Sequence, residues 1–285
     1  MTSKKTSKRI SFLIIGLLIA AGFIAGCGQQ DNKAPGDNQN SGELTGTLTI
    51  AGSTSVQPFS EVLAEKFMEK NPGVQINVQG GGSSQGVEAA ISGVADIGAA
   101  SRELKDEEKA KNLVVTTLAN DGIAIVIHPA NRVNDLRQEE VKNIYLGNIT
   151  NWKNVGGEDE PIAVVCREDG SGTRGAFEEL VMNGEEISDK AIIQNSNGAL
   201  RTTVVGDKNA IGFLSLAHIN KEVKAVNIEG AAATVENIKN GTYKIYRPLN
   251  YVTKTAPRGL AKAYIDFVLS DEGQAIVVEE GAISI

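Results

Sequence analysis

A strand, a glycine-rich loop and a helix follow one another repeatedly along this chain, and this order constrains the fold more than any other feature. Thr47–Gly52 alternates apolar and polar residues, and the next segment places Phe59, Leu63 and Phe67 at helical spacing. The cycle then repeats with a strand at 74–80, a helix at 87–96 and a strand at 97–101. This succession predicts the α/β class, with mainly parallel sheets flanked by helices.

The chain divides into two halves at an almost purely apolar strand, Gly122–Pro129. A second set of strands and helices follows, and Tyr243–Lys254 reads as an extended segment that crosses back. We therefore expect two lobes joined by two hinge crossings, at Ile127–Pro129 and at Tyr246–Pro248. The first lobe is predicted to comprise residues 45–127 and 248–285, and the second residues 128–247. Ligands of parallel sheets bind beyond the carboxyl ends of the strands, where the glycine-rich loops fall.

Residues 1–26 have the layout of an export signal, with four cations before an apolar stretch from Ile10 to Ala25. That stretch is short for a membrane span, although an uncleaved anchor helix is the alternative. Ile24–Cys27 resembles a bacterial lipobox, so Cys27 is expected to become the first residue and to carry a lipid. Residues 27–44 are then a polar, flexible tether. This arrangement predicts a protein anchored to the cell membrane and facing its extracytoplasmic side.

Charge and cysteine content argue against nucleic-acid binding and against a disulfide in the mature chain. Loss of the four signal cations would take the formal net charge from −7 to −11. Such an acidic chain without a basic stripe is not expected to bind nucleic acid. Because Cys27 and Cys166 are the only cysteines, a lipid on Cys27 leaves no disulfide within the mature chain. Cys166 is expected to be a small buried apolar residue.

Three loops combine glycine with hydroxyl side chains, and each stands between a predicted strand and a predicted helix. A helix start offers unpaired backbone N–H groups and the positive end of the helix dipole, and glycine permits close approach to that backbone. A single serine or threonine there is usually only a helix cap. Three such loops in two lobes instead favour a shared anion. The candidate ligands are Ser53, Thr54 and Ser55 in the first loop, Ser83 in the second, and Ser171, Gly172 and Thr173 in the third.

Two arginines stand close to these loops in the sequence. Arg167 precedes Ser171 by four residues, and Arg102 follows Ser101 at the end of a predicted strand. The planar guanidinium can hold two oxygens of a tetrahedral anion at once, so Ser101, Arg102 and Arg167 join the candidate ligands. Asp169 is predicted to orient the Arg167 guanidinium. For either arginine alone, a surface salt bridge is the alternative.

Catalytic patterns are lacking in the sequence. Ser171 lacks the nucleophile elbow of hydrolases, and neither His128 nor His218 is placed as a base for it. Zinc, calcium and P-loop spacings are also missing. We therefore expect a binding protein without catalytic residues, metal or cofactor, and a hydrolase on the same scaffold is the less favoured alternative.

Several motifs together resemble the phosphate-binding lipoproteins that serve ABC phosphate importers. The resemblance rests on AGSTSVQP, QGGGSSQGVEA, ADIGAASREL, NIYLGNITNW, REDGSGTRGAF, SNGAL and LSDEGQAIVVEEGAISI, in this order. It implies a two-lobed type II periplasmic-binding-protein fold that closes around phosphate, and docking, as a monomer, on an ABC permease. By this resemblance, Thr54, the Ser55 backbone, Ser83, Arg167, Ser171, Gly172 and Thr173 contact the anion, and Asp169 is the partner of the arginine.

One position departs from that family pattern. Some family members have Ser-Asp at the end of the third strand, where the aspartate accepts a hydrogen bond from the proton on phosphate, whereas this chain has Ser101-Arg102. A carboxylate at this point distinguishes phosphate from unprotonated sulfate, because it would be left facing an oxygen that donates nothing. Sulfate, molybdate and tungstate therefore stay open as alternative ligands.

Overall fold

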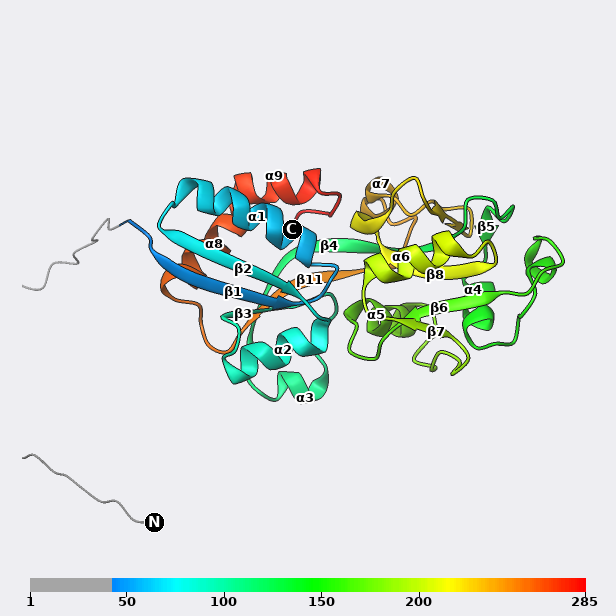
Figure 1. Cartoon of the computed structure of the whole chain (residues 1–285), viewed down its shortest axis with the longest axis horizontal. Helices are drawn as coiled ribbons and strands as arrows, with labels where there is room; N and C mark the ends of the chain where they lie inside the picture. The colour runs from blue at the N-terminus through cyan, green and yellow to red at the C-terminus, as the bar shows by residue number, and fades with distance from the viewer. Residues whose placement is uncertain (1–42) are drawn as a thin grey trace, which may run out of the picture. The chain divides into compact units, whose positions relative to one another are not determined.

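The computed structural model describes residues 43–285, in which both halves of the chain contribute strands to one continuous sheet (Figure 1). Nine strands form this sheet, and Asn227–Ile228 pairs with Asp135–Leu136 in a separate sheet. The predicted signal peptide, Cys27 and the tether up to residue 42 lie outside the described residues. No helix within residues 43–285 is both long and apolar enough to cross a membrane.

The first lobe is built from both ends of the described chain. Its strands β1, β2 and β3 are parallel, and β11 runs antiparallel to β3. In α1, Phe59, Leu63 and Phe67 recur at helical spacing and are buried in the core of this lobe. Its elements are β1 (Gly46–Gly52), α1 (Gln57–Lys70), β2 (Val74–Gly80), α2 (Ser83–Ser92), β3 (Ile97–Ala100), α3 (Asp106–Lys109), β11 (Tyr246–Thr253), α8 (Gly259–Leu269) and α9 (Asp271–Glu279).

The second lobe has its own core around Tyr145, Phe177 and Phe213, whose rings pack against one another. Cys166 is buried in this core, as expected. Strands β6, β7 and β8 are parallel. Its elements are β5 (Asp135–Leu136), α4 (Gln138–Tyr145), η1 (Trp152–Val155), β6 (Ala163–Arg167), α5 (Gly172–Leu180), β7 (Ile192–Gln194), α6 (Asn197–Gly206), β8 (Ala210–Ser215), η2 (Leu216–His218), β9 (Lys224–Ala225), β10 (Asn227–Ile228) and α7 (Val235–Lys239).

Strand β4 (Val114–Ile127) and strand β11 connect the two lobes (Figure 1). Residues 114–122 of β4 pair with β11, and residues 123–127 pair with β8. Ile123, Ile125 and Ile127 accordingly pack in the second core. The first crossing thus lies near residue 122, upstream of the expected Ile127–Pro129, because the apolar strand continues unbroken into the second lobe. On the returning segment, Ile245 packs in the core of the second lobe and Leu249 in the core of the first. The second crossing therefore lies between them, where the hinge Tyr246–Pro248 is expected.

Both lobes share one strand order, in which a parallel trio is followed by two antiparallel strands. The trio β2-β1-β3 is followed by β11 and β4, and the trio β7-β6-β8 is followed by β4 and β9. In the first trio, Gly52 has a φ of +139°, and a Cβ atom there would lie 2.3 Å from the carbonyl oxygen of Ala99. Glycine is therefore required where the chain leaves β1 and enters the first candidate loop.

Candidate functional site

The loops that follow β1, β2 and β3 bring their hydroxyl groups into direct contact. Ser53 Oγ donates to Ser101 Oγ at 2.8 Å, and the backbone N–H of Ser101 donates to Ser83 Oγ over 3.0 Å. Ser83 and Ser101 are fully buried, and Ser53 nearly so. Three predicted ligands that lie far apart in the sequence therefore meet at the carboxyl ends of three parallel strands.

The same group of side chains continues into the second lobe. The hydroxyl oxygens of Ser55 and Thr173 are 2.9 Å apart, and Ser55 N donates to Ser53 Oγ at 3.1 Å. Ser84 N, at the start of α2, donates to the carbonyl oxygen of Gly170 across the lobe boundary at 3.0 Å. These contacts join the two lobes through a set of buried residues that we call the hydroxyl cluster. It comprises Ser53, Ser55, Ser83, Ser101 and Thr173.

Gly172 lies at a close approach between the two lobes. A Cβ atom at this position would be 2.3 Å from Ser83 Oγ and 2.7 Å from Ser101 Oγ, both in the first lobe. No ordinary side chain fits there without moving the opposite loops. The sequence motif identified this glycine, and the structure supplies the reason, which is a close approach between lobes.

Helix starts surround the hydroxyl cluster, and they differ in how they are capped. Neither α1 nor α2 has a side-chain cap, and Ser83 contacts Ser101 instead of capping its own helix. In α5, by contrast, Ser171 Oγ accepts a hydrogen bond from Arg174 N at 3.2 Å, so the cap interpretation holds for Ser171. First-turn N–H groups have no partner within their own helix and lie at the positive end of its dipole. Gln57 N is already bonded to the carbonyl oxygen of Ser53 and Ser84 N to that of Gly170, so the other first-turn N–H groups and the hydroxyls are the donors suited to an anion.

Arg167 ends β6 and is almost completely buried, with 1% of its side chain exposed. Its Nε and Nη2 donate to the two carboxylate oxygens of Glu168, each at 2.9 Å. The prediction that Asp169 orients this arginine is wrong, because Asp169 is largely exposed and pairs with Arg174. Consecutive side chains at the end of a strand point to opposite sides, but the turn after Arg167 folds Glu168 back onto it.

Arg102, a predicted anion ligand, instead binds side chains of its own lobe. Its Nη1 and Nη2 donate to Glu108 at 2.7 and 2.8 Å, and Nη2 also donates to Ser84 Oγ at 3.1 Å. Burial by itself raises the pKa of Glu108, but the hydrogen bonds from Arg102 and from Lys105 N lower it overall. These contacts make Arg102 a support for the starts of α2 and α3, and they give no support to a role as anion ligand.

Two residues of the second lobe that the sequence reasoning missed, Asn197 and His218, bind the first loop. Asn197 Nδ2 donates to Ser55 Oγ at 3.0 Å and to Thr54 Oγ1 at 3.2 Å. His218 Nε2 is 2.8 Å from the carbonyl oxygen of Thr54. Burial lowers the pKa of His218 to about 4, so the neutral ring donates this hydrogen bond. Both follow parallel strands, β7 and β8, and the strand-loop-helix pattern was the signal that could have found them.

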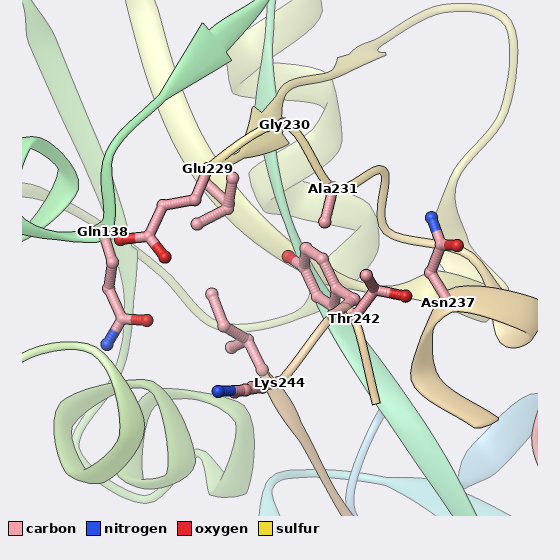
Figure 2. Close-up of a pocket in the computed structure, with 10 residues that line it drawn as sticks. Gln138, Glu229, Gly230, Ala231, Asn237, Thr242 and Lys244 are labelled. Carbon is pink, nitrogen blue, oxygen red and sulfur yellow. The ribbon is translucent and has the colours of Figure 1, made fainter. Parts of the chain in front are cut away.

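Cavities lie both beside the cluster and away from it. An open cavity of about 480 Å³ at the lobe boundary is lined by Thr54, Gln85 and Glu168, among others, and adjoins the hydroxyl cluster. Figure 2 shows a different cavity, of about 360 Å³, in the second lobe, where Glu229 and Lys244 border the same space. None of the predicted ligands lines this second cavity.

Comparison with known proteins places this geometry in a family. A PBP superfamily domain matches residues 37–272. The phosphate-binding protein PstS of Bacillus subtilis is 35% identical over 282 residues, which cover 96% of this chain and 94% of that protein. The chain belongs to the PstS family of this superfamily. The family fold is the two-lobed arrangement predicted from the sequence.

Solved structures of family members agree with this assignment. A putative phosphate ABC transporter substrate-binding protein with bound phosphate, from Clostridium perfringens, is 45% identical with a TM-score of 0.81. An ABC-type phosphate transport receptor from Vibrio cholerae is 40% identical with a TM-score of 0.70. Each match covers 84% of this chain and 100% of the other. The PstS family thus accounts for the entire described fold.

Proposed function

We propose that this chain captures inorganic phosphate between its lobes and delivers it to an ABC importer. The observation that carries this proposal is the buried hydroxyl cluster, which both lobes build and which lies beside the uncapped starts of α1 and α2. The names of the relatives agree, since they are phosphate-binding proteins, and one of their structures contains phosphate. The proposed ligands are Thr54, Ser55, Ser83, Arg167, Ser171, Gly172 and Thr173, with Ser53 and Ser101 holding the hydroxyls in place.

The number of donors is sufficient for tight binding. A micromolar dissociation constant needs about 8 kcal/mol of net binding free energy. Hydrogen bonds to a charged group contribute about 1.5 to 3 kcal/mol each. Seven or more convergent donors exceed that requirement and offset the desolvation of the anion and the ordering of the two lobes. The acidic surface does not prevent this, because its charges are screened over about 8 Å at physiological ionic strength.

Binding and closure are coupled in this proposal. Phosphate first binds the loops of one lobe, and the donors of the other lobe then complete the shell and favour the closed form. The lobes rotate about β4 and β11, which are the two strands that cross between them. Opening at the permease would expose the anion again by separating Ser55 from Thr173 and Ser84 from Gly170.

The remaining parts of the proposal concern location and chemistry. We propose that a lipid on Cys27 anchors a monomer at the extracytoplasmic face of the cell membrane, and that residues 27–44 tether it there. We also propose binding without turnover. Under this proposal sulfate, molybdate and tungstate are competitors that the site discriminates against.

Calorimetric titration of the purified protein with phosphate, sulfate and molybdate tests the proposed function. We expect phosphate to bind with a micromolar or lower dissociation constant and the other anions at least tenfold more weakly. Small-angle scattering should show a smaller radius of gyration at saturating phosphate. Failure to bind phosphate would overturn the proposal, preferential binding of another anion would change the ligand, and phosphatase turnover would favour the hydrolase alternative.

A further inference from the structure

Four buried side-chain polar atoms have no hydrogen-bond partner in the described part of the chain, and they all lie in one place. They are Asp121 Oδ1, Ser215 Oγ, Arg247 Nε and Arg247 Nη1. Asp121 on β4 stands opposite Arg247 on β11, and Ser215 ends β8, the other neighbour of β4. A buried polar group without a hydrogen-bond partner destabilises the fold. Their concentration where the strands cross between the lobes indicates that a bound polar group completes them.

These atoms are connected to the hydroxyl cluster. Ser215 N donates to Asn197 Oδ1 at 3.3 Å, and the amide nitrogen of the same asparagine binds Ser55 Oγ at 3.0 Å. Burial lowers the pKa of Arg247, and the positive charge of Arg167 acts in the same direction. The unpaired atoms lie on the hinge side of the site that the loops build.

Their chemistry matches a protonated oxyanion. Arg247 Nε, Arg247 Nη1 and Ser215 Oγ donate hydrogen bonds to oxygens that carry charge. Asp121 Oδ1 is the acceptor of this group. Burial raises the pKa of Asp121, although Arg247, the nearby Ser215 hydroxyl and the backbone N–H of Leu216 act to lower it. A phosphate that keeps one proton has oxygens to accept from these donors and a proton to donate to the carboxylate, whereas sulfate has no proton to donate at neutral pH.

We propose that Asp121, Arg247 and Ser215 form the hinge-side wall of the anion site and that Asp121 selects phosphate over sulfate by accepting a hydrogen bond from the protonated phosphate oxygen. This inference rests on the proposed function. Arg247 Nη2 donates to Asp121 Oδ2 at 2.9 Å and thereby holds the carboxylate, while Oδ1 stays unpaired and can accept a hydrogen bond from the anion. The wall supplies the acceptor that Arg102 cannot provide at the end of β3.

The buried pair of Arg102 and Glu108 provides a matched control. It is also an arginine with a carboxylate in a buried setting, but both of its carboxylate oxygens are bonded, at 2.7 and 2.8 Å. Asp121→Asn and Glu108→Gln each remove one negative charge and keep the shape of the side chain. Loss of a negative charge favours every anion, so the ratio of the phosphate and sulfate affinities is the decisive quantity.

The experiment is calorimetric titration of the full-length wild type, Asp121→Asn and Glu108→Gln with phosphate and with sulfate at pH 7. We expect Asp121→Asn to lower the phosphate-to-sulfate affinity ratio at least tenfold and Glu108→Gln to leave it within twofold. An unchanged ratio in Asp121→Asn would overturn the inference and leave the proposed function intact. A wild type that binds no phosphate would instead refute the proposed function.

A second variant keeps the inference testable if Asp121→Asn does not fold. Ser215→Ala removes one unpaired buried hydroxyl and should leave the thermal unfolding midpoint the same or slightly higher. We expect it to weaken phosphate binding at least threefold. Wild-type affinity in Ser215→Ala would refute the assignment of this wall to the site.

Discussion

Replacing Gly172 by alanine should disfavour lobe closure without changing the stability of the lobes themselves. The three atoms nearest to a Cβ at this position are Ser83 Oγ at 2.3 Å, Ser101 Oγ at 2.7 Å and the carbonyl carbon of Ser101 at 3.0 Å. All three belong to the first lobe, whereas Gly172 begins α5 in the second. The added methyl group therefore collides only when the lobes are closed.

The collision cannot be relieved by a simple side-chain rotation. Ser83 Oγ is held by the hydrogen bond from Ser101 N, and the backbone of Ser101 is itself in contact. Overpacking of this kind costs about 1 to 3 kcal/mol. If the cost falls on the closed form alone, phosphate binding weakens about 5- to 150-fold. Calorimetry should detect this loss, while the thermal unfolding midpoint without phosphate changes little.

Gly175→Ala is the matched control on the same helix. A Cβ atom there would meet only Arg102 Cδ, at 3.4 Å, which is an ordinary contact with a flexible side chain. We expect unchanged affinity and a small gain in stability, of up to about 1 kcal/mol, from the better helix former. A Gly172→Ala protein that binds phosphate as well as the wild type would refute the closure geometry.

Three further predictions follow from individual contacts. Arg167→Ala should weaken phosphate binding by at least about 2 kcal/mol in calorimetry, while Lys244→Ala, in the separate cavity of Figure 2, should not change it. His218 has its pKa lowered to about 4 from 6.5, so its contribution is lost as pH falls below 6.5. Urea denaturation should show the wild type losing about 3 kcal/mol more than His218→Gln between pH 7 and pH 4. Glu108→Gln should lower the free energy of unfolding by about 2 kcal/mol at pH 7. This difference should shrink below pH 4.5, because the lowered pKa of Glu108 makes the wild type lose the ion pair in acid.

The fold and the loops of the site could be predicted because both depend on local patterns. Strand-loop-helix order specifies a parallel sheet, and the carboxyl ends of neighbouring parallel strands must lie at one edge. Ser53, Ser83 and Ser101 could therefore be grouped before any contact was known. The same argument would have reached Asn197 and Ser215, which stand after β7 and at the end of β8.

Pairings between side chains were less predictable. Spacing along the chain favoured Asp169 as the partner of Arg167, but the turn after β6 brings the adjacent Glu168 onto the guanidinium and leaves Asp169 exposed. The partner of Arg102 lies six residues away on α3, a short helix that the sequence pattern does not predict. The sequence predicts the first crossing at Ile127–Pro129, downstream of its position near residue 122. The reason is that β4 is buried in both lobes, so its apolar pattern continues without a break across the boundary between them.

The charge balance of the buried arginines shows how an acidic protein can hold an anion. Arg102, Arg167 and Arg247 are the buried arginines of residues 43–285, and each has a carboxylate partner, Glu108, Glu168 and Asp121 respectively. The side chains therefore add little net positive charge to the site. Attraction must come from oriented groups, namely the helix starts, the hydroxyls and the unpaired edge of Arg247. Oriented groups satisfy an anion only when its oxygens and its proton lie at defined positions. The arrangement that binds a protonated anion therefore also distinguishes it from an anion without a proton.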